Sequence, residues 1–251
     1  MPIGWDDVDP QTALAALVRA LELGINLFDT ADVYGHGTSE RLLGRLLVSA
    51  EREDVVICTK GGFFAEKGEH PYEPQRLQRQ ILRSLTNLGT DYIDCYFLHS
   101  SNFGPNDQYL QQALELLRGL RDMRVIRAIG MRAPHTFAEE WARGEGPTAT
   151  RTARWLHLFH MIQPQVIAVR YNLLSSPAHE GETDIFAFAR RHDVGVLIKQ
   201  ALGQGRLVRN YSSHPTPVFS AQDHRSADRL QTRGTRRGSP STAPTARPFR
   251  H

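Results

Sequence analysis

Four polar side chains in the first hundred residues could together deliver a proton to a carbonyl oxygen. Asp29, Lys60 and His99 each follow a short apolar run, and Tyr34 lies five residues beyond Asp29. A lysine ammonium close to a tyrosine favours the phenolate, so it lowers a phenol pKa that is ordinarily about 10. We expect Asp29 to keep Lys60 charged and His99 to orient the substrate oxygen. The set therefore predicts a general acid, Tyr34, beside an electrophilic clamp.

The elements that must position these residues alternate along the chain. Strict alternation of apolar runs and helical patterns, without a hairpin signal, predicts parallel strands joined by helical crossovers. Such strands form either an open doubly wound sheet or a (β/α) barrel, and in a barrel the chemistry lies at their carboxyl ends. No Gly-x-Gly-x-x-Gly follows the first strand, which disfavours a dinucleotide-binding sheet. We expect strands at residues 25–28, 55–59, 92–98, 126–131, 166–169 and 194–198, and helices at 10–23, 38–48, 74–88, 109–123, 135–143, 152–162 and 184–192.

The composition limits the classes of protein to which the chain can belong. The chain has 251 residues, of which 40% are hydrophobic, enough to bury a full core. It lacks an apolar run of about 18 residues, and its first residues lack a basic, apolar leader, so neither a membrane span nor a signal peptide is expected. Cys58 and Cys95 lie inside apolar runs and predict two buried free thiols in a reducing, cytoplasmic compartment.

The charge is divided unevenly along the chain. Residues 206–251 carry nine arginines and two aspartates, whereas residues 1–205 carry 21 basic and 25 acidic residues. Residues 208–251 therefore read as a basic tail, which from about residue 232 has too few apolar residues to order itself. A nucleic-acid partner is not expected, because the tail has no lysine, aromatic interleaving or amphipathic period.

Three segments resemble the aldo-keto reductase family. They are GINLFDTADVYGHGTSERLLG (24–44), VVICTKGG (55–62) and LTNLGTDYIDCYFLHS (85–100). The resemblance covers roughly residues 5–207 and implies that Asp29, Tyr34, Lys60 and His99 are the catalytic tetrad. It also implies an eight-stranded (β/α) barrel and a nicotinamide cofactor, usually NADPH, for the reduction of aldehydes and ketones.

The resemblance weakens where the family binds its cofactor. Arg132 and Ala133 stand where the family usually has Ser-Asn, Ala168 where it has Gln, and Lys199 where an aromatic ring often stacks on the nicotinamide. No metal site is expected. The cofactor contacts that the resemblance implies are Arg132, Tyr171, Lys199, Gln200, Leu202, Gly203 and Gly205.

Only six strands are expected, and the first and eighth strands of the family have no counterpart. The expected fold is thus an incomplete (β/α) TIM-type barrel over residues 1–207, whose two unpaired edges favour a homodimer.

Three functions remain open from the sequence. The first is NADPH-dependent reduction of a small carbonyl substrate. The second is a cofactor-independent acid/base enzyme (an isomerase, cyclase or eliminase) that reuses the tetrad. The third is a non-catalytic truncated remnant.

Overall fold

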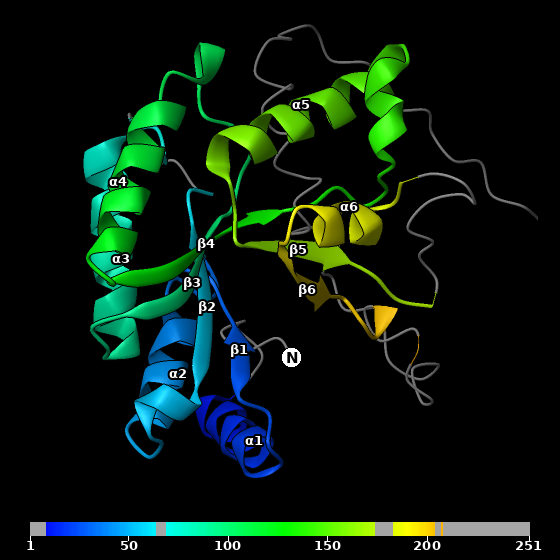
Figure 1. Cartoon of the computed structure of the whole chain (residues 1–251). Helices are drawn as coiled ribbons and strands as arrows, with labels where there is room; N and C mark the ends of the chain where they lie inside the picture. The colour runs from blue at the N-terminus through cyan, green and yellow to red at the C-terminus, as the bar shows by residue number, and fades with distance from the viewer. Residues whose placement is uncertain (1–8, 64–68, 174–182, 204–206, 208–251) are drawn as a thin grey trace, which may run out of the picture. The chain divides into compact units, whose positions relative to one another are not determined.

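Six parallel strands form one curled sheet in the order of the sequence (Figure 1). This computed structural model describes residues 9–63, 69–173, 183–203 and 207. Because every strand pairs with its sequence neighbour, the order never reverses, as it would in a doubly wound sheet. The expected incomplete (β/α) barrel is therefore confirmed. The strands are β1 (Leu27–Asp29), β2 (Val56–Gly61), β3 (Ile93–Leu98), β4 (Ile126–Arg132), β5 (Val166–Arg170) and β6 (Gly195–Lys199).

Helices separate the strands and cover the outer face of the sheet (Figure 1). Asp9 caps the first helix by accepting a hydrogen bond from the amide of Thr12 at 2.8 Å. None of the helices in the described ranges is long and apolar enough to cross a bilayer. They are α1 (Pro10–Glu22), α2 (Thr38–Leu47), α3 (Pro74–Leu88), α4 (Leu110–Asp122), α5 (Gly146–Ile162) and α6 (Ile185–Arg191).

Two of the helix predictions were wrong in their bounds. Only Glu139–Arg143 of the expected helix at 135–143 is helical, as a 3-10 turn. Helix α5 begins at Gly146, six residues earlier than expected, because Pro147 fits the first helical turn, where its missing N–H breaks no hydrogen bond. Every helix and strand named here belongs to the compact unit Met1–Gln204, and the predicted tail, 208–251, lies outside the described residues.

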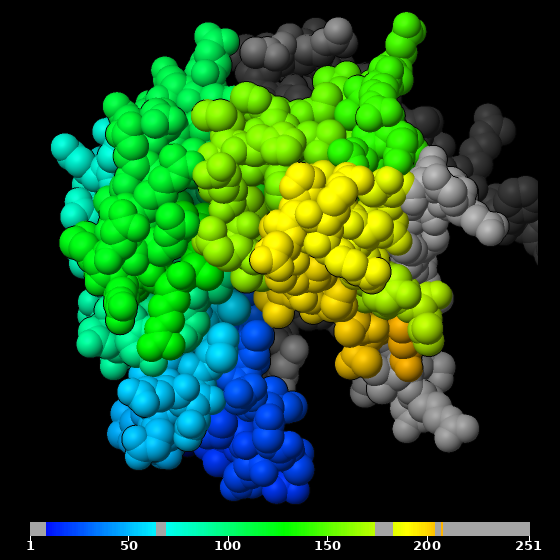
Figure 2. Space-filling view, viewed as in Figure 1, coloured from blue at the N-terminus to red at the C-terminus, as the bar shows by residue number. Residues whose placement is uncertain are grey.

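The sheet has two different faces because side chains alternate along each strand. On the outer face, Ile57, Ile129 and Ile167 are fully buried in the core beneath the helices. A smaller apolar cluster, which includes Cys58 and Phe97, lies on the inner face. Cys58 and its register partner Cys95 are both free and buried, as expected. Strands β1 and β6 are the outermost strands, and the surface is hollowed between them (Figure 2).

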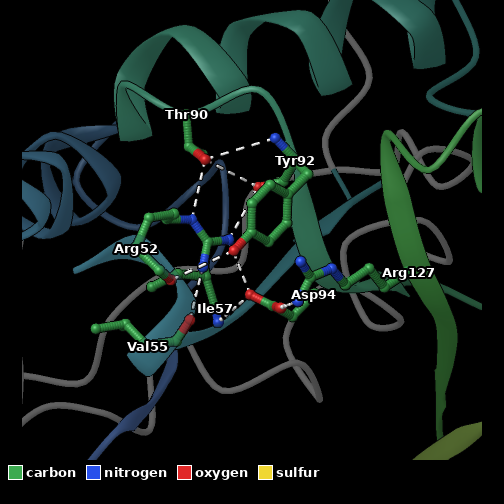
Figure 3. Close-up of polar contacts among 7 residues, drawn as sticks. All are labelled: Arg52, Val55, Ile57, Thr90, Tyr92, Asp94 and Arg127. Carbon is green, nitrogen blue, oxygen red and sulfur yellow. Dashed lines mark hydrogen bonds and ion pairs between the residues drawn. The ribbon is translucent and has the colours of Figure 1, made fainter.

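A charged cluster ties the amino ends of β2, β3 and β4 together (Figure 3). Asp94 accepts hydrogen bonds from the amide of Ile57 at 2.9 Å, from Arg52 at 2.8 Å and from Arg127 at 3.0 Å. The two guanidinium groups lie 3.8 and 3.9 Å from the centroid of the Tyr92 ring, which is between them. This cluster joins residues about 40 positions apart in the chain, so it stabilises tertiary structure and not a single element.

We predict that Asp94→Ala lowers the free energy of unfolding by about 2–4 kcal/mol, because two arginines and a backbone amide lose their shared acceptor. Denaturant unfolding of the purified variant measures the loss. Glu22→Ala is the matched control, since its ion pair with Arg19 is exposed on both sides and should matter by less than about 0.5 kcal/mol. Equal stabilities for the two variants would contradict this role for Asp94.

Candidate active site

Three of the four predicted residues meet at the carboxyl ends of neighbouring strands. Asp29 is the last residue of β1, Lys60 lies inside β2, and His99 follows β3 directly. Strands β1 and β2 end one and two residues later than the sequence indicated, so Asp29 and Lys60 belong to the sheet itself, and β1 also begins two residues later, at Leu27. Alternation places all three on the inner face, the same face as Cys58 and Phe97.

Lys60 is held between two oxygen atoms of β1 and the segment after it. Its Nζ donates to Asp29 Oδ1 at 2.7 Å and to the backbone oxygen of Thr30 at 2.5 Å. The lysine is only 5% exposed. Burial alone would lower the pKa of Lys60, but the Asp29 carboxylate and Tyr34 outweigh it and raise that pKa above its ordinary value. Lys60 therefore carries a fixed positive charge inside the site.

Tyr34 reaches the site from the loop between β1 and α2. Lys60 Nζ lies 5.3 Å from the centroid of the Tyr34 ring. The loop turns sharply after the tyrosine, because residues 35–37 all have positive φ angles of 56°, 50° and 84°. The φ of 84° at Gly37 favours glycine, and a Cβ there would lie 2.7 Å from Asn87 Nδ2, so the end of that side chain would have to shift. The sequence Gly-His-Gly thus sets the position from which Tyr34 faces Lys60.

His99 is fully buried, and its neighbours fix both its backbone and its ring. Its amide donates to the Gly61 oxygen at 2.9 Å, and its own oxygen accepts from Arg132 Nη1 at 3.3 Å. The ring lies edge-on to Tyr34, with 6.2 Å between centroids, and 4.9 Å from the ring of Phe63. The four predicted residues therefore converge on one end of the sheet, where a carbonyl oxygen could contact both Tyr34 and His99.

A second carboxyl group, Asp32, lies in the loop between Asp29 and Tyr34. Its amide donates to the Lys60 oxygen at 3.1 Å, while its Oδ1 atom is buried without a hydrogen-bond partner in the part of the chain that the structure describes. Burial, and then the nearby Glu40 carboxylate, raise the pKa of Asp32 to about 7. Glu40 is itself fully buried and accepts a hydrogen bond from Thr59 at 2.7 Å. The sequence offered no signal for this shift, which depends on tertiary burial.

The predicted cofactor residues follow the tetrad around the same end of the sheet. Arg132 and Lys199 are the last residues of β4 and β6, and Tyr171 directly follows β5, donating from its amide to the Lys199 oxygen at 3.3 Å. Gln200 and Gly203 form a turn, with positive φ angles and a hydrogen bond of 2.9 Å between them. Leu202 is exposed in this turn, and Gly205 lies outside the described residues.

Arg170 is the residue that sequence reasoning missed. The strand was expected to end at 169, which would have put Arg170 in a loop, whereas it pairs in register with Lys199 as the last residue of β5. The sequence did contain one signal for Arg170. It lies two residues after Ala168, and residues two apart in a strand lie on the same face.

The chain matches the model of the family described as Aldo/keto reductase family over residues 1–246. Among curated proteins, L-galactose dehydrogenase from Arabidopsis thaliana is 27% identical over 213 residues, which are 82% of this chain and 58% of that protein. An NADH-specific methylglyoxal reductase from Escherichia coli (strain K12) is 33% identical over 139 residues, 50% of this chain and 43% of the relative. The chain thus spans about half of the length of these two relatives.

Solved structures match in the same way. The holo form of an aldo-keto reductase from Bacillus halodurans has a TM-score of 0.62 at 25% identity, covering 86% of this chain and 64% of that one. An aldo-keto reductase from Klebsiella pneumoniae in complex with NADPH has a TM-score of 0.59 at 26% identity, covering 88% and 68%.

We predict that Asp32 makes the protein less stable as the pH rises from about 4 to about 7. Its pKa is about 7 in the folded protein and 3.8 ordinarily, so between these values the folded state keeps a proton that the unfolded chain has released. Asp32→Asn should remove this loss and be more stable than the wild type at pH 8 by about 2–4 kcal/mol. Urea unfolding of both proteins at pH 5 and at pH 8 measures this difference in the free energy of unfolding.

Asp54→Asn, the same substitution at an exposed aspartate, is the matched control. If the free energy of unfolding changes with pH by the same amount in the wild type and in Asp32→Asn, then Asp32 does not keep its proton in the folded protein.

Proposed function

The chain belongs to the aldo/keto reductase family, and we propose that it reduces the carbonyl group of a small molecule to an alcohol with NADPH, using Tyr34 as the general acid. One observation carries this proposal. The buried Lys60 ammonium is bound by Asp29 and by the Thr30 oxygen, and it lies 5.3 Å from the centroid of the Tyr34 ring. Since the charge is fixed beside the ring, it favours the phenolate that forms when Tyr34 gives up its proton.

Each tetrad residue has a distinct task in this proposal. NADPH, when bound, supplies the hydride that reduces the carbonyl carbon. Tyr34 donates its hydroxyl proton to the carbonyl oxygen, and Lys60 stabilises the charge that remains on the phenol. His99, whose amide donates to the Gly61 oxygen and whose ring packs against Phe63, orients the oxygen toward Tyr34. Asp29 keeps Lys60 charged and in place, and so acts through the lysine as a positioning residue.

The residues beyond the tetrad fit the cofactor's charged and polar groups. Lys199 and the turn at 200–203 suit a phosphate, because an ammonium favours anions, as do backbone N–H groups of the turn other than that of Gly203, which donates to the Gln200 oxygen. Arg132 can donate to the oxygen of a carboxamide. Tyr171, Gln200 and Leu202 flank these groups. The complex of the Klebsiella pneumoniae reductase with NADPH supports the same cofactor for this chain.

One position favours the second candidate, a cofactor-independent isomerase, cyclase or eliminase. Ala168 is buried on the inner face of β5 and has no side-chain oxygen to accept a hydrogen bond from a carboxamide nitrogen. The loss of one such hydrogen bond weakens binding by about 0.5–1.5 kcal/mol, or up to about tenfold. The tetrad would then perform proton transfer on a carbonyl compound without hydride transfer.

We predict that NADPH binds with micromolar affinity and that Tyr34→Phe lowers kcat for small aldehydes by about 10²- to 10⁴-fold, because the proton donor is lost. The Kd for NADPH should change by less than about twofold. Fluorescence titration measures binding, and NADPH absorbance measures turnover. Tyr109→Phe is the control, since this ring packs on His70 outside the tetrad.

Absence of NADPH binding up to millimolar concentration would overturn the reductase proposal. Turnover of a carbonyl compound without cofactor, lost in Tyr34→Phe, would then select the second candidate. A folded protein with neither activity would leave the non-catalytic hypothesis.

A further inference from the structure

The inner face carries more positive charge at its carboxyl end than the tetrad needs. Strands β4, β5 and β6 end on Arg132, Arg170 and Lys199. Alternation places each on the inner face, because Val166 and Ala168 of β5, and Leu197 of β6, belong to the inner cluster. Of the six inner-face residues at these strand ends, only Asp29 is acidic, and it is engaged with Lys60.

The register places these cations at the height of Lys60 along the barrel axis. Hydrogen-bonded partners lead from Lys60 to Phe97, then to Gly130, Val166 and Gly195. The strands of a (β/α) barrel tilt, so the residue at constant height advances by about one position per strand. From Lys60 this rule leads to about residue 132 on β4, 169 on β5 and 199 on β6. Arg132 and Lys199 therefore lie level with Lys60, and Arg170 lies within one residue of that level.

The side chain of Arg170 also has a buried hydrogen-bond donor, Nε, for which no described residue provides an acceptor. Its Nε atom is buried, and no hydrogen bond or ion pair reaches its side chain within the described ranges. A buried donor without an acceptor is costly, and guanidinium groups match the paired oxygen atoms of carboxylates and phosphates. The neighbouring strand end, Arg132, is in register with Ala168, two residues before Arg170. The two Cα atoms are thus about 8 Å apart, from the spacing and rise of strands, so the charge of Arg132 adds to the positive potential around Arg170.

We propose that Arg170, in the positive field of the neighbouring Arg132 and Lys199, binds an anionic group of the substrate, so that the carbonyl compound carries a carboxylate or a phosphate. The inference rests on the proposed function for the carbonyl end of the ligand. The anion belongs to the substrate because Arg170 lies within one residue of the level of Lys60, whereas the cofactor phosphates are assigned to the turn after β6. Since β3, which leads to His99, and β5 are two strand spacings apart, or about 10 Å, the substrate separates its two groups by several atoms.

The test compares 4-carboxybenzaldehyde with benzaldehyde, which lacks the anion. The wild type should have a KM at least about tenfold lower for the carboxylated aldehyde. Arg170→Met should raise that KM by about 10- to 100-fold and change the KM of benzaldehyde by less than about twofold. Arg45→Met, at an exposed arginine of α2, should behave as the wild type in both assays.

A measurement without turnover separates this inference from the reductase proposal. Calorimetry with the two alcohols, 4-(hydroxymethyl)benzoate and benzyl alcohol, should show a preference for the benzoate that Arg170→Met abolishes. If neither aldehyde is reduced and this preference is still seen, the reductase proposal fails and the anion site stands. Circular dichroism melts confirm that the variant is folded.

Two results would overturn the anion site. One is a wild type that does not discriminate between the members of each pair. The other is an Arg170→Met variant that keeps the discrimination but binds NADPH at least about tenfold more weakly, which would assign Arg170 to a cofactor phosphate.

Discussion

The contact between Asp29 and Lys60 joins two strands at the end of the sheet where the other site residues meet. An ammonium that is 5% exposed is tolerated only beside an anion and further hydrogen-bond acceptors, which Asp29 and the Thr30 oxygen provide. Both come from β1 and its extension, so they depend on the register in which Asp29 pairs with Cys58. A slip of one residue would move Asp29 to the outer face and leave the lysine without its anion. The register in which β1 pairs with β2 is therefore also the register that keeps the charge of Lys60 neutralised by Asp29.

The two ends of the sheet use charge for different purposes. At the amino end, Asp94 is saturated by Arg52, Arg127 and a backbone amide, and Tyr92 fills the space between the guanidinium groups. This cluster links three strands and stabilises the fold. At the carboxyl end, Arg170 has a buried donor that no described residue satisfies. This division agrees with the general behaviour of (β/α) barrels, in which activity belongs to the carboxyl ends of the strands.

The sequence allowed much of the fold to be predicted, because apolar runs and helical periods reflect local preferences. All six strands and the convergence of the tetrad followed from alternation and from the ends of these runs. The end of β5 did not, since the apolar run stops at Val169 while the hydrogen bonds to β6 continue to Arg170. The pKa of Asp32 and the cluster around Asp94 could not be predicted either. Both depend on residues that are distant in the sequence and meet only after folding.

The paired thiols of Cys58 and Cys95 provide an intrinsic reporter of motion. They lie on two adjacent strands, in register, and are 3% and 4% exposed. A hydrogen bond with Cys58, and then burial, raise the pKa of Cys95, so this sulfur is in its unreactive protonated form. A thiol reagent must therefore wait for an opening motion that exposes the inner face of β2 and β3. The rate at which the folded protein is labelled measures the free energy of that opening at the strand that carries Lys60, without any probe having to be introduced.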